Sequence, residues 1–307
     1  MNDIIELSHS SLTLQLRLQG AAVLGLYDGQ KSKRPLLRPA PGFDAPVGEC
    51  ALFPMLPLAN RVEGNSFTRQ GHRYKLPDSV MDDRFFLHGD GWLKPWTLVE
   101  QQESTVCLAL ESCVEGLYHY QAYLHYGLIE NIFYATLQLT HLAETPFPYG
   151  LGFHPFLMKT PAAELQFECG GYWPEREFHL PGKWCSELPD TLDFQLPKSP
   201  GDIWINNAFS DWPGSVSLRD EIYGHSLTMH SDADYLMVYQ LAGKQAMPFI
   251  CLEPQTHPVN AHNHPQLPGL KLLRRGESCT LNMQIVSEVL VNKLTPVLRT
   301  GPRFPTV

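Results

Sequence analysis

The sequence predicts an all-β protein built from antiparallel sheets, because its apolar residues recur at every second position along most of the chain. Between residues 12 and 18, four leucines alternate with Thr13, Gln15 and Arg17, the pattern of a strand with one buried face and the first element we expect. Convincing amphipathic helices are missing, and two segments carry the signal of a β-hairpin. Together these observations predict one large antiparallel β-sandwich.

Further strands are expected where the alternation returns. One hairpin is predicted from Ser66 to Tyr74 with its turn at Gln70-Gly71, and a second joins 215–219 to 225–229 through a turn that contains Gly224. The other predicted strands are 106–110, 132–139, 235–239, 249–252 and 279–285. The chemistry of the protein should therefore lie on sheet edges and loops.

The distribution of prolines and glycines favours a single domain. The 26 prolines and 23 glycines are spread over the whole length, without a low-complexity tract or a short repeat. Residues 34–46 contain four prolines and predict a surface loop, and the segment from Val291 onward reads as a tail. We therefore expect one domain over residues 1–290 and a C-terminal tail over 291–307.

Charge and cysteine usage bear on partners and on compartment. The net charge of −9, from 23 Lys+Arg and 32 Asp+Glu, opposes binding to nucleic acid or to anionic membranes. The seven cysteines are odd in number, scattered and without a C-x-x-C pair, which indicates reduced thiols, and the N-terminus lacks the features of a signal peptide. We expect a cytoplasmic monomer or homodimer that binds neither nucleic acid nor membrane.

Glu253 is the strongest candidate for a proton-transfer group. The apolar run from Pro248 to Leu252 leads directly into this carboxylate, and Pro254 and Pro258 follow closely. We expect the prolines to end the strand and to stiffen the following loop, so that Glu253 lies on a rigid and partly desolvated edge. Such a site suits a general base.

Two other segments combine polar side chains with apolar neighbours. His154 follows two glycines and lies between Phe153 and Pro155-Phe156, which makes it either a hydrogen-bonded core residue or a functional imidazole. Arg61 follows the largely apolar stretch 53–60, and a nearly buried guanidinium needs acceptors. We interpret Arg61 as a functional residue.

The segment His88-Gly89-Asp90-Gly91-Trp92 has two interpretations. Its glycines let the backbone approach a ligand closely, while Trp92 offers a stacking face and His88 a polar group. A tight turn with a packed tryptophan explains the same residues equally well.

Metal and nucleotide chemistry have little support. His257, His262 and His264 form a tempting cluster, but they lie in a Pro- and Asn-rich loop without the spacing of a helical metal motif. The sequence also lacks a G-x-S-x-G elbow, a P-loop and a G-x-G-x-x-G turn after a strand. We expect no metal and no cofactor.

Taken together and in order, four motifs resemble those of the aldose 1-epimerases, also called galactose mutarotases. The motifs are Asn60-Arg61, His88-Gly89, the Gly-Phe-His-Pro-Phe around His154, and Glu253-Pro254, and they span nearly the whole chain. The resemblance implies a β-supersandwich of large antiparallel sheets. It also implies a cofactor-independent isomerase that interconverts the anomers of a free aldohexose such as galactose or glucose.

Transferred residue by residue, the resemblance implies roles for the site. Glu253 is then the general base, His154 the general acid, and Arg61 and His88 bind and polarise the sugar. Trp92 is a further substrate-binding candidate, since its ring, or that of Trp96, offers a face on which a sugar stacks.

The chain departs from the family pattern at two positions. The family usually carries an aspartate that binds sugar hydroxyls in a Leu-Asp-x-x-Phe segment, whereas residues 205–209 here place Asn206 at that position. An amide both donates and accepts, so Asn206 is expected to bind the sugar. Asn260 similarly stands where an aspartate before alanine is common. Both differences concern the identity of the sugar more than the type of reaction.

Three alternatives accompany this interpretation. A hexose-6-phosphate 1-epimerase would need arginines for the phosphate dianion, and Arg61, Arg69, Arg73 and Arg84 are candidates. A non-catalytic carbohydrate-binding protein on the same fold is supported only by Asn206. A metal-dependent sugar enzyme would use the loop histidines.

Overall fold

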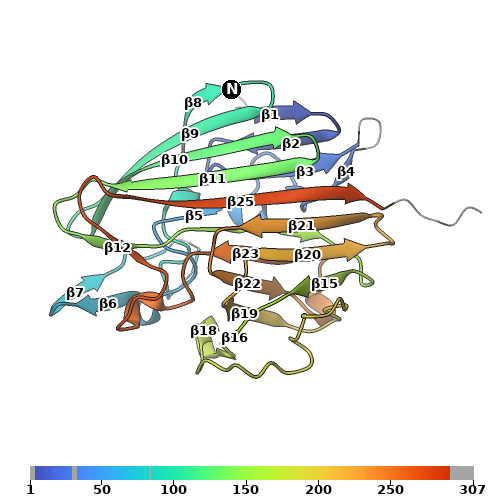
Figure 1. Ribbon diagram of the computed structural model, residues 1–307. Helices are drawn as coiled ribbons and strands as arrows, with labels where there is room; N and C mark the ends of the chain where they lie inside the picture. Colours follow the sequence, from blue (N-terminus) through green and yellow to red (C-terminus); the bar gives the residue numbers. More distant parts are fainter. Residues whose placement is uncertain (1–3, 30–32, 80, 83, 291–307) are drawn as a thin grey trace, which may run out of the picture.

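The computed structural model describes residues 4–29, 33–79, 81, 82 and 84–290, and in these ranges the only helices are single 3-10 turns. The largest sheet has eight antiparallel strands, side by side in Figure 1. In spatial order they are β15 (Glu164–Phe167), β20 (Ser215–Asp220), β21 (His225–Ser231), β25 (Ser278–Val289), β11 (Ile132–His141), β10 (Tyr118–Ile129), β9 (Thr105–Val114) and β8 (Thr97–Gln101). The prediction of an all-β protein with large antiparallel sheets is confirmed.

A seven-stranded sheet lies below the long strands in Figure 1 and is the sheet that matters for chemistry. Its order is β16 (Gly171–Tyr172), β19 (Ile205–Ser210), β22 (Tyr235–Gln240), β23 (Phe249–Gln255), β13 (Gly152–Phe153) and β5 (Pro54–Met55), and β14 (Phe156–Met158) also pairs with β23. Strand β23 is thus central, with β22 on one side and β13 and β14 on the other.

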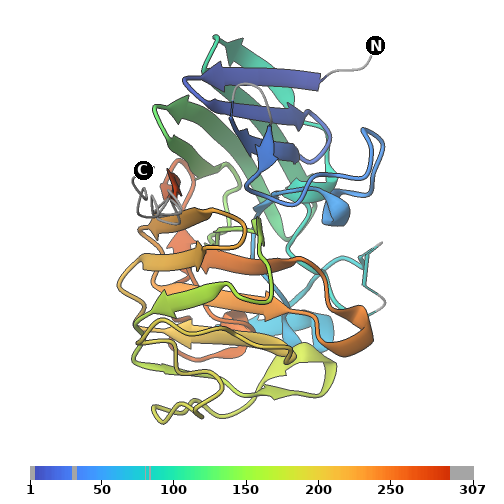
Figure 2. The same ribbon diagram turned by 90° about the vertical axis from the view of Figure 1, so that its right-hand side faces the viewer.

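Smaller elements complete the fold. The N-terminal strands β1 (Ile4–His9), β2 (Leu12–Arg17), β3 (Val23–Asp28) and β4 (Arg34–Pro35) form a four-stranded sheet, seen in blue at the upper edge of Figure 2. Two-stranded ribbons pair β6 (Ser66–Arg69) with β7 (His72–Lys75), β12 (Phe147–Tyr149) with β24 (Lys271–Leu273), and β17 (Glu175–Arg176) with β18 (Leu180–Pro181). The 3-10 turns are η1 (Val47–Glu49), η2 (Glu63–Asn65), η3 (Gly91–Leu93), η4 (Glu177–His179), η5 (Gly243–Gln245) and η6 (Ala261–Asn263).

One apolar cluster joins the sheets. Leu124 of β10 and Leu281 of β25 belong to it, together with Val238 of β22, Leu252 of β23 and Leu14 of β2. Each of these side chains is completely buried. At about 25 cal/mol per Å² of apolar surface, burial of this cluster supplies the main driving force for folding.

The predicted strands all form, but several observed strands were not predicted, among them β3, β8, β15 and β19. Both hairpins form, and the first turns at Gln70 and Gly71, which both adopt positive φ angles. Strand β1 precedes the element predicted as the first, and β10 was missed altogether. In β10 buried residues alternate with polar ones, but the buried ones include Tyr118, Tyr120 and Tyr126, whose hydroxyl groups conceal the apolar pattern.

Strand β23 corrects the prediction that Pro254 ends the strand at Glu253. The strand continues through Pro254 to Gln255, and Glu253 lies within it rather than at an edge. Proline lacks an N–H, but an antiparallel ladder needs only alternate N–H groups toward each neighbour, and the ladder toward β13 and β14 is interrupted beside Pro254. Glu253 is therefore more deeply buried than expected.

The predicted surface loop 34–46 is also partly wrong. Arg34 and Pro35 pair with β3, and Leu36 and Leu37 are buried in the core. The predicted tail from Val291 lies outside the described residues, and the division into one domain and a tail stays a prediction. None of the described helices has the length or the apolar character required to cross a membrane.

Candidate active site

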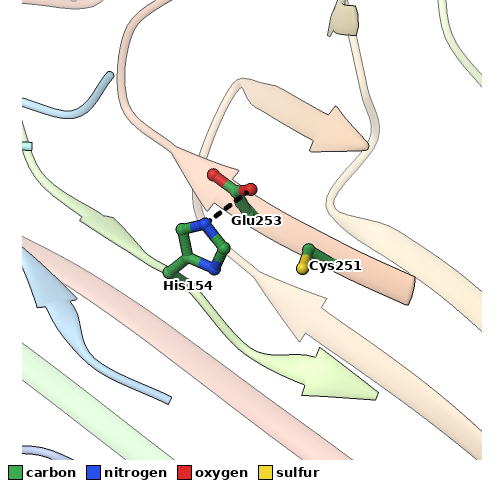
Figure 3. A group of neighbouring side chains, drawn as sticks. All are labelled: His154, Cys251 and Glu253. Carbon is green, nitrogen blue, oxygen red and sulfur yellow. Dashed lines mark ion pairs between the residues drawn. The ribbon is translucent and has the colours of Figure 1, made fainter. Parts of the chain in front are cut away.

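Glu253 and His154 face each other across adjacent strands. Gly152 of β13 and Phe156 of β14 both pair with β23, and the same register puts His154, between them, opposite Glu253. His154 Nε2 lies 3.1 Å from Glu253 Oε1, and the dashed line in Figure 3 marks this ion pair. The structure thus brings together the two residues expected to act as acid and base.

The alternation of β23 explains why a carboxylate occurs in an apolar strand. Ile250 and Leu252 point into the main core cluster, while Cys251 and Glu253 point to the other face of the sheet. Both faces of β23 are buried, so its sequence is an apolar run from Phe249 to Leu252 that ends where Glu253 faces the site.

A stack of rings holds His154 in place. The imidazole stacks on Phe53, with ring centroids 4.7 Å apart, and on Phe156 at 4.6 Å. Trp92 extends the stack beyond Phe53 at 4.8 Å, and the Arg38 guanidinium lies 3.7 Å from the centroid of Phe156. The imidazole therefore has one fixed plane, with its Nε2 edge toward the carboxylate.

Burial disfavours charge on both members of the pair. Only 2% of Glu253 is exposed, and desolvation raises the pKa of its carboxyl to about 8, although the hydrogen bond from Gln255 and the charge of Arg61 oppose this shift. Desolvation lowers the pKa of His154 to about 3, and the nearby Arg38 acts in the same direction. Between these values the coupled pair holds one titratable proton, as an acid–base couple requires.

Arg61 reaches the same cavity from the loop after β5. Its Nε lies 3.4 Å from Asp82 Oδ2, and Nη1 donates to Asn60 Oδ1 at 3.3 Å. Burial lowers its pKa, while the charges of Asp82, Glu253 and Glu175 raise it, and an arginine remains charged under these conditions. The interpretation of Arg61 as a charged group with acceptors agrees with this geometry.

His88 is held as a neutral hydrogen-bond donor. The backbone N–H of Asn60 donates to His88 Nδ1 at 3.0 Å, so the proton of the neutral ring lies on Nε2. Burial lowers the pKa of His88 well below its usual value, and the neighbouring His154 and Arg61 add to this effect. His88 lines the cavity and has Nε2–H available for a ligand.

The turn after His88 is held by close backbone contacts. Gly89 has a φ of +72°, and a Cβ at this position would lie 2.2 Å from the carbonyl oxygen of Leu56. Asp90 accepts hydrogen bonds from Tyr120 at 2.7 Å and Ser112 at 2.6 Å. The turn therefore serves to place His88, while Asp90 anchors it to the eight-stranded sheet.

Trp92 lines the cavity but has little free surface. Only 2% of it is exposed, its Nε1–H donates to the carbonyls of Leu87 and Gly89, and one face of its ring is stacked on Phe53. Trp96 is a core residue whose Nε1–H donates to Gly91. The packed-turn interpretation of this segment fits both tryptophans, and the contact between Trp92 and a sugar stays a prediction.

Asn206 lies on the cavity face of the sheet, two strands from β23. It pairs with Tyr239 of β22, which in turn pairs with Cys251. Asn260, in contrast, lies outside the cavity lining, and its Oδ1 accepts the backbone N–H of Glu63 at 2.9 Å. The departure at Asn206 thus concerns the cavity wall, whereas that at Asn260 concerns a loop contact.

The cavity has a volume of about 340 Å³ and contains all six residues that the sequence singled out. Several further polar and aromatic side chains line it that the sequence did not indicate, namely Arg38, His179, Trp204 and Tyr239. Of the arginines considered for a phosphate, only Arg61 lines the cavity. Arg69 and Arg73 lie on the β6–β7 hairpin, and the Arg84 guanidinium lies over the ring of Phe178.

The loop histidines have structural contacts. His257 accepts the N–H of Ala59 with Nε2 at 3.0 Å and donates to the carbonyl of Pro258 with Nδ1 at 2.8 Å. His262 donates to the carbonyl of Pro148, and His264 is exposed. The three rings do not converge on a common point that a metal would occupy.

His154, Cys251 and Glu253 are a second group of residue types that bind metals, and their ligand atoms lie within 4.8 Å of one another (Figure 3). Ligand atoms around a tetrahedral ion lie about 3.3–3.8 Å apart. Burial raises the pKa of Cys251 well above its usual value and keeps the thiol protonated, while the cation of Arg38 lies nearby. The charge and spacing of this group fit a shared proton better than a divalent cation.

Comparison with known proteins places this geometry in a family. A family model described as aldose 1-epimerase matches residues 3–286. The uncharacterized protein YphB of Escherichia coli K12 is 34% identical over 293 residues, which cover 94% of this chain and 99% of that protein. Both matches span nearly the whole chain.

Solved structures show the same fold. The crystal structure of a candidate aldose 1-epimerase from Escherichia coli K12 superimposes with a TM-score of 0.88 at 34% identity, covering 94% of this chain and 99% of that one. A GalM/aldose epimerase homologue from C. elegans gives a TM-score of 0.80 at 17% identity, over 94% and 99% of the two chains. The implied galactose mutarotase-like β-supersandwich is therefore confirmed, and the chain belongs to the aldose 1-epimerase family.

Proposed function

We propose that this chain is a cofactor-independent isomerase that interconverts the α- and β-anomers of a free aldohexose, such as galactose or glucose. The observation that carries the proposal is the buried pair of Glu253 Oε1 and His154 Nε2, 3.1 Å apart, in a cavity that Arg61 and His88 also line. The cavity volume of about 340 Å³ lies at the small end of the range for ligand pockets.

The reaction needs one base and one acid on a single sugar ring. Glu253 takes the proton of the C1 hydroxyl while His154 protonates the ring oxygen O5, so the C1–O5 bond breaks and O1 becomes an aldehyde oxygen. The aldehyde rotates about C1–C2, and O5 then adds to the opposite face of C1 with the two roles reversed. The pair ends each cycle with the proton it had at the start, so no co-reactant is consumed.

The pair holds the one proton that this cycle uses. Burial favours the neutral form of both groups, whereas the mechanism begins with an ionised Glu253 and a protonated His154. These arrangements differ only in the position of one proton between Nε2 and Oε1. Gln255 donates to Glu253 Oε2 at 3.0 Å and, with the Arg61 cation, stabilises the ionised form.

Arg61 and His88 supply the binding contacts in this proposal. The guanidinium and the Nε2–H of His88 are donors, and the oxygens of a sugar are acceptors that gain negative charge as the ring opens. Preorganised donors in a site with little water stabilise such charge more strongly than water does.

A rate panel tests the proposal. Fresh α-glucose, α-galactose and other α-aldoses are followed by polarimetry or by NMR saturation transfer with and without protein. We expect at least one sugar to equilibrate faster with the protein. Equal rates for the whole panel would overturn the enzyme assignment, and calorimetric binding of a sugar without rate acceleration would instead support a non-catalytic carbohydrate-binding protein.

A specific observation favours a hexose-6-phosphate as the second candidate substrate. Arg38, which the sequence did not indicate, lines the cavity as a second arginine beside Arg61. Its Nη2 donates to the carbonyls of Gly48 and Cys50 and its guanidinium stacks on Phe156, so the contacts described for this cation involve no carboxylate. Glucose 6-phosphate belongs in the panel, and a higher kcat/KM for it than for glucose would favour this candidate.

We also propose a cytoplasmic location and a monomer or homodimer that binds neither nucleic acid nor membrane. All seven cysteines are free thiols, and several, including Cys50 and Cys251, are buried without a disulfide partner. This agrees with a reducing compartment.

A further inference from the structure

A cluster of four side chains lies two strands from β23, and three of them line the cavity. Glu175 of β17 is at its centre, and Trp204 Nε1–H donates to its Oε2 at 2.6 Å. Asn206 Nδ2 donates to Glu175 Oε1 at 2.5 Å, and His179 Nδ1 contacts the same oxygen at 2.5 Å. Trp204, Asn206 and His179 line the cavity, and Glu175 does not. Glu175 therefore contacts three cavity side chains from outside the lining.

The carboxylate fixes the orientation of the Asn206 amide. An ionised carboxylate only accepts hydrogen bonds, so Asn206 must turn its NH₂ group toward Glu175 and its Oδ1 away from it. Oδ1 has no hydrogen-bond donor among the described residues. Asn206 therefore offers the cavity an acceptor oxygen, as an aspartate at the same position would.

Trp204 adds a flat apolar surface to this wall. It is 41% exposed, in contrast to the buried Trp92, and its N–H is already bonded to Glu175. The rings of Trp204 and Tyr239 form a T-shaped pair with centroids 5.5 Å apart. A ring held in this way presents an apolar face to the C–H groups of a ligand that has polar edges.

The backbone that carries His179 is strained. Phe178 and His179 both have a φ of 60°, a region that residues with a Cβ rarely occupy. Two such residues in succession cost free energy that the fold must offset elsewhere, and this kind of strain concentrates at ligand sites. Here the two positive φ angles direct the His179 imidazole toward Glu175.

We infer that Glu175, His179, Trp204 and Asn206 form a subsite that recognises the hydroxyl groups and one C–H face of a neutral aldose. Glu175 is a positioning residue in this subsite, because it orients the Asn206 acceptor and the Trp204 ring without lining the cavity itself. The inference rests on the proposed function. It also explains the amide at position 206, since a carboxylate there would stand 2.5 Å from that of Glu175.

The proposed subsite predicts that the amide at position 206 and the carboxylate at position 175 can exchange places. Asn206→Asp alone places two carboxylates in contact, and Glu175→Gln alone turns an NH₂ group toward donors. The double variant Glu175→Gln/Asn206→Asp restores the pairing, because the introduced glutamine amide donates to the new carboxylate and accepts from Trp204. An acceptor oxygen at position 206 again faces the cavity.

The test measures kcat and KM separately for the best aldose of the panel. We expect Asn206→Asp to raise KM about tenfold or more with kcat changed little, since lost uniform binding appears in KM. We expect the double variant to return to within about threefold of the wild type, and lowering the pH to rescue Asn206→Asp partly because the two carboxylates then share a proton. Trp204→Leu should raise KM by about five- to tenfold.

Glu177→Gln is the matched control. It removes the same charge from an exposed residue next to β17 and should leave KM within about twofold of the wild type. A double variant whose KM is the product of the two single effects, or single variants with unchanged KM, would overturn the subsite while leaving the enzyme active. A wild type without activity on any sugar would instead overturn the proposed function, so the two failures differ.

Discussion

Two buried histidines on opposite sides of Glu253 in the sequence differ in what their ring nitrogens contact. His257 lies in the loop after β23, and both of its nitrogens bond to backbone groups of Ala59 and Pro258. His154 shares Nε2 with the carboxyl of Glu253, and its Nδ1 has no partner in the described part of the chain. Burial lowers the pKa of both, to about 4 and about 3.

The comparison shows that burial and a lowered pKa do not by themselves mark a functional histidine. The ring nitrogens of His257 bond only to a backbone N–H and a backbone C=O, which do not exchange protons near neutral pH, so its role is structural. His154 meets a group that titrates in the same environment, so a proton can move between the two. The partner, more than the environment, distinguishes the two histidines.

The largest expected effect is on catalysis. Glu253→Gln keeps the shape of the side chain but removes the base, and His154→Asn removes the acid, so each should lower kcat by roughly 10²–10⁴-fold. Saturation-transfer NMR measures the rate, and Glu164→Gln on the exposed face of β15 is a control. Unchanged activity in either site variant would remove that residue from the mechanism.

The second expected effect distinguishes the structural role of His257 from the proposed acid role of His154. His257→Leu leaves the Ala59 N–H and the Pro258 carbonyl without partners, so urea unfolding should show a loss of about 1–3 kcal/mol. We expect kcat to stay within a few-fold of the wild type. A stable variant with kcat reduced as strongly as in His154→Asn would show that the comparison is wrong.

The pH dependence sharpens the comparison further. Activity should fall above about pH 8, where the pair loses its last titratable proton, and should show no step near the usual histidine pKa of about 6.5, because the pKa of His154 lies near 3. An inflection of kcat/KM near pH 6.5 would mean that a freely titrating histidine governs the reaction.

The lowered pKa of His257 makes the stability of the protein depend on pH in the acidic range. Since the native pKa of His257 is about 4, the unfolded chain binds more protons than the native chain between about pH 4 and 6.5. The free energy of unfolding should therefore decrease as the pH falls through this window. His257→Leu should reduce that decrease, which urea titrations at several pH values would measure.

The smallest expected effect is that of a chelator. Incubation with EDTA should leave the rate unchanged, and elemental analysis should find no stoichiometric metal, because the His154–Cys251–Glu253 group suits a proton better than a cation. Loss of activity on chelation with recovery on adding zinc would reverse this interpretation.

The sequence predicted those parts of the site that depend on local pattern. Glu253 was indicated by its apolar run, and His154 by its aromatic neighbours. Pro254, however, suggested the end of a strand, because the sequence does not show that the neighbouring ladder is interrupted at that residue. The burial of Glu253 was underestimated for this reason.

The remaining cavity residues depend on how distant strands are arranged. Arg38 lies in a proline-rich segment that looked like a surface loop, and Trp204 follows an irregular stretch before β19. Glu175 reaches Asn206 because the chain continues beyond β16 alongside β19, which no spacing in the sequence indicates. Residues of this kind become visible only once strand order and register are known.

The ring stack around His154 has a consequence for where motion occurs during the reaction. An imidazole stacked on both Phe53 and Phe156 and buried beside Glu253 has little room to follow its substrate, and Glu253 is fixed within a central strand. Changing one anomer into the other nevertheless requires one end of the molecule to turn over. In the proposed reaction that movement belongs to the sugar alone, and the protein acts as a stationary frame within which the aldehyde turns about a single bond.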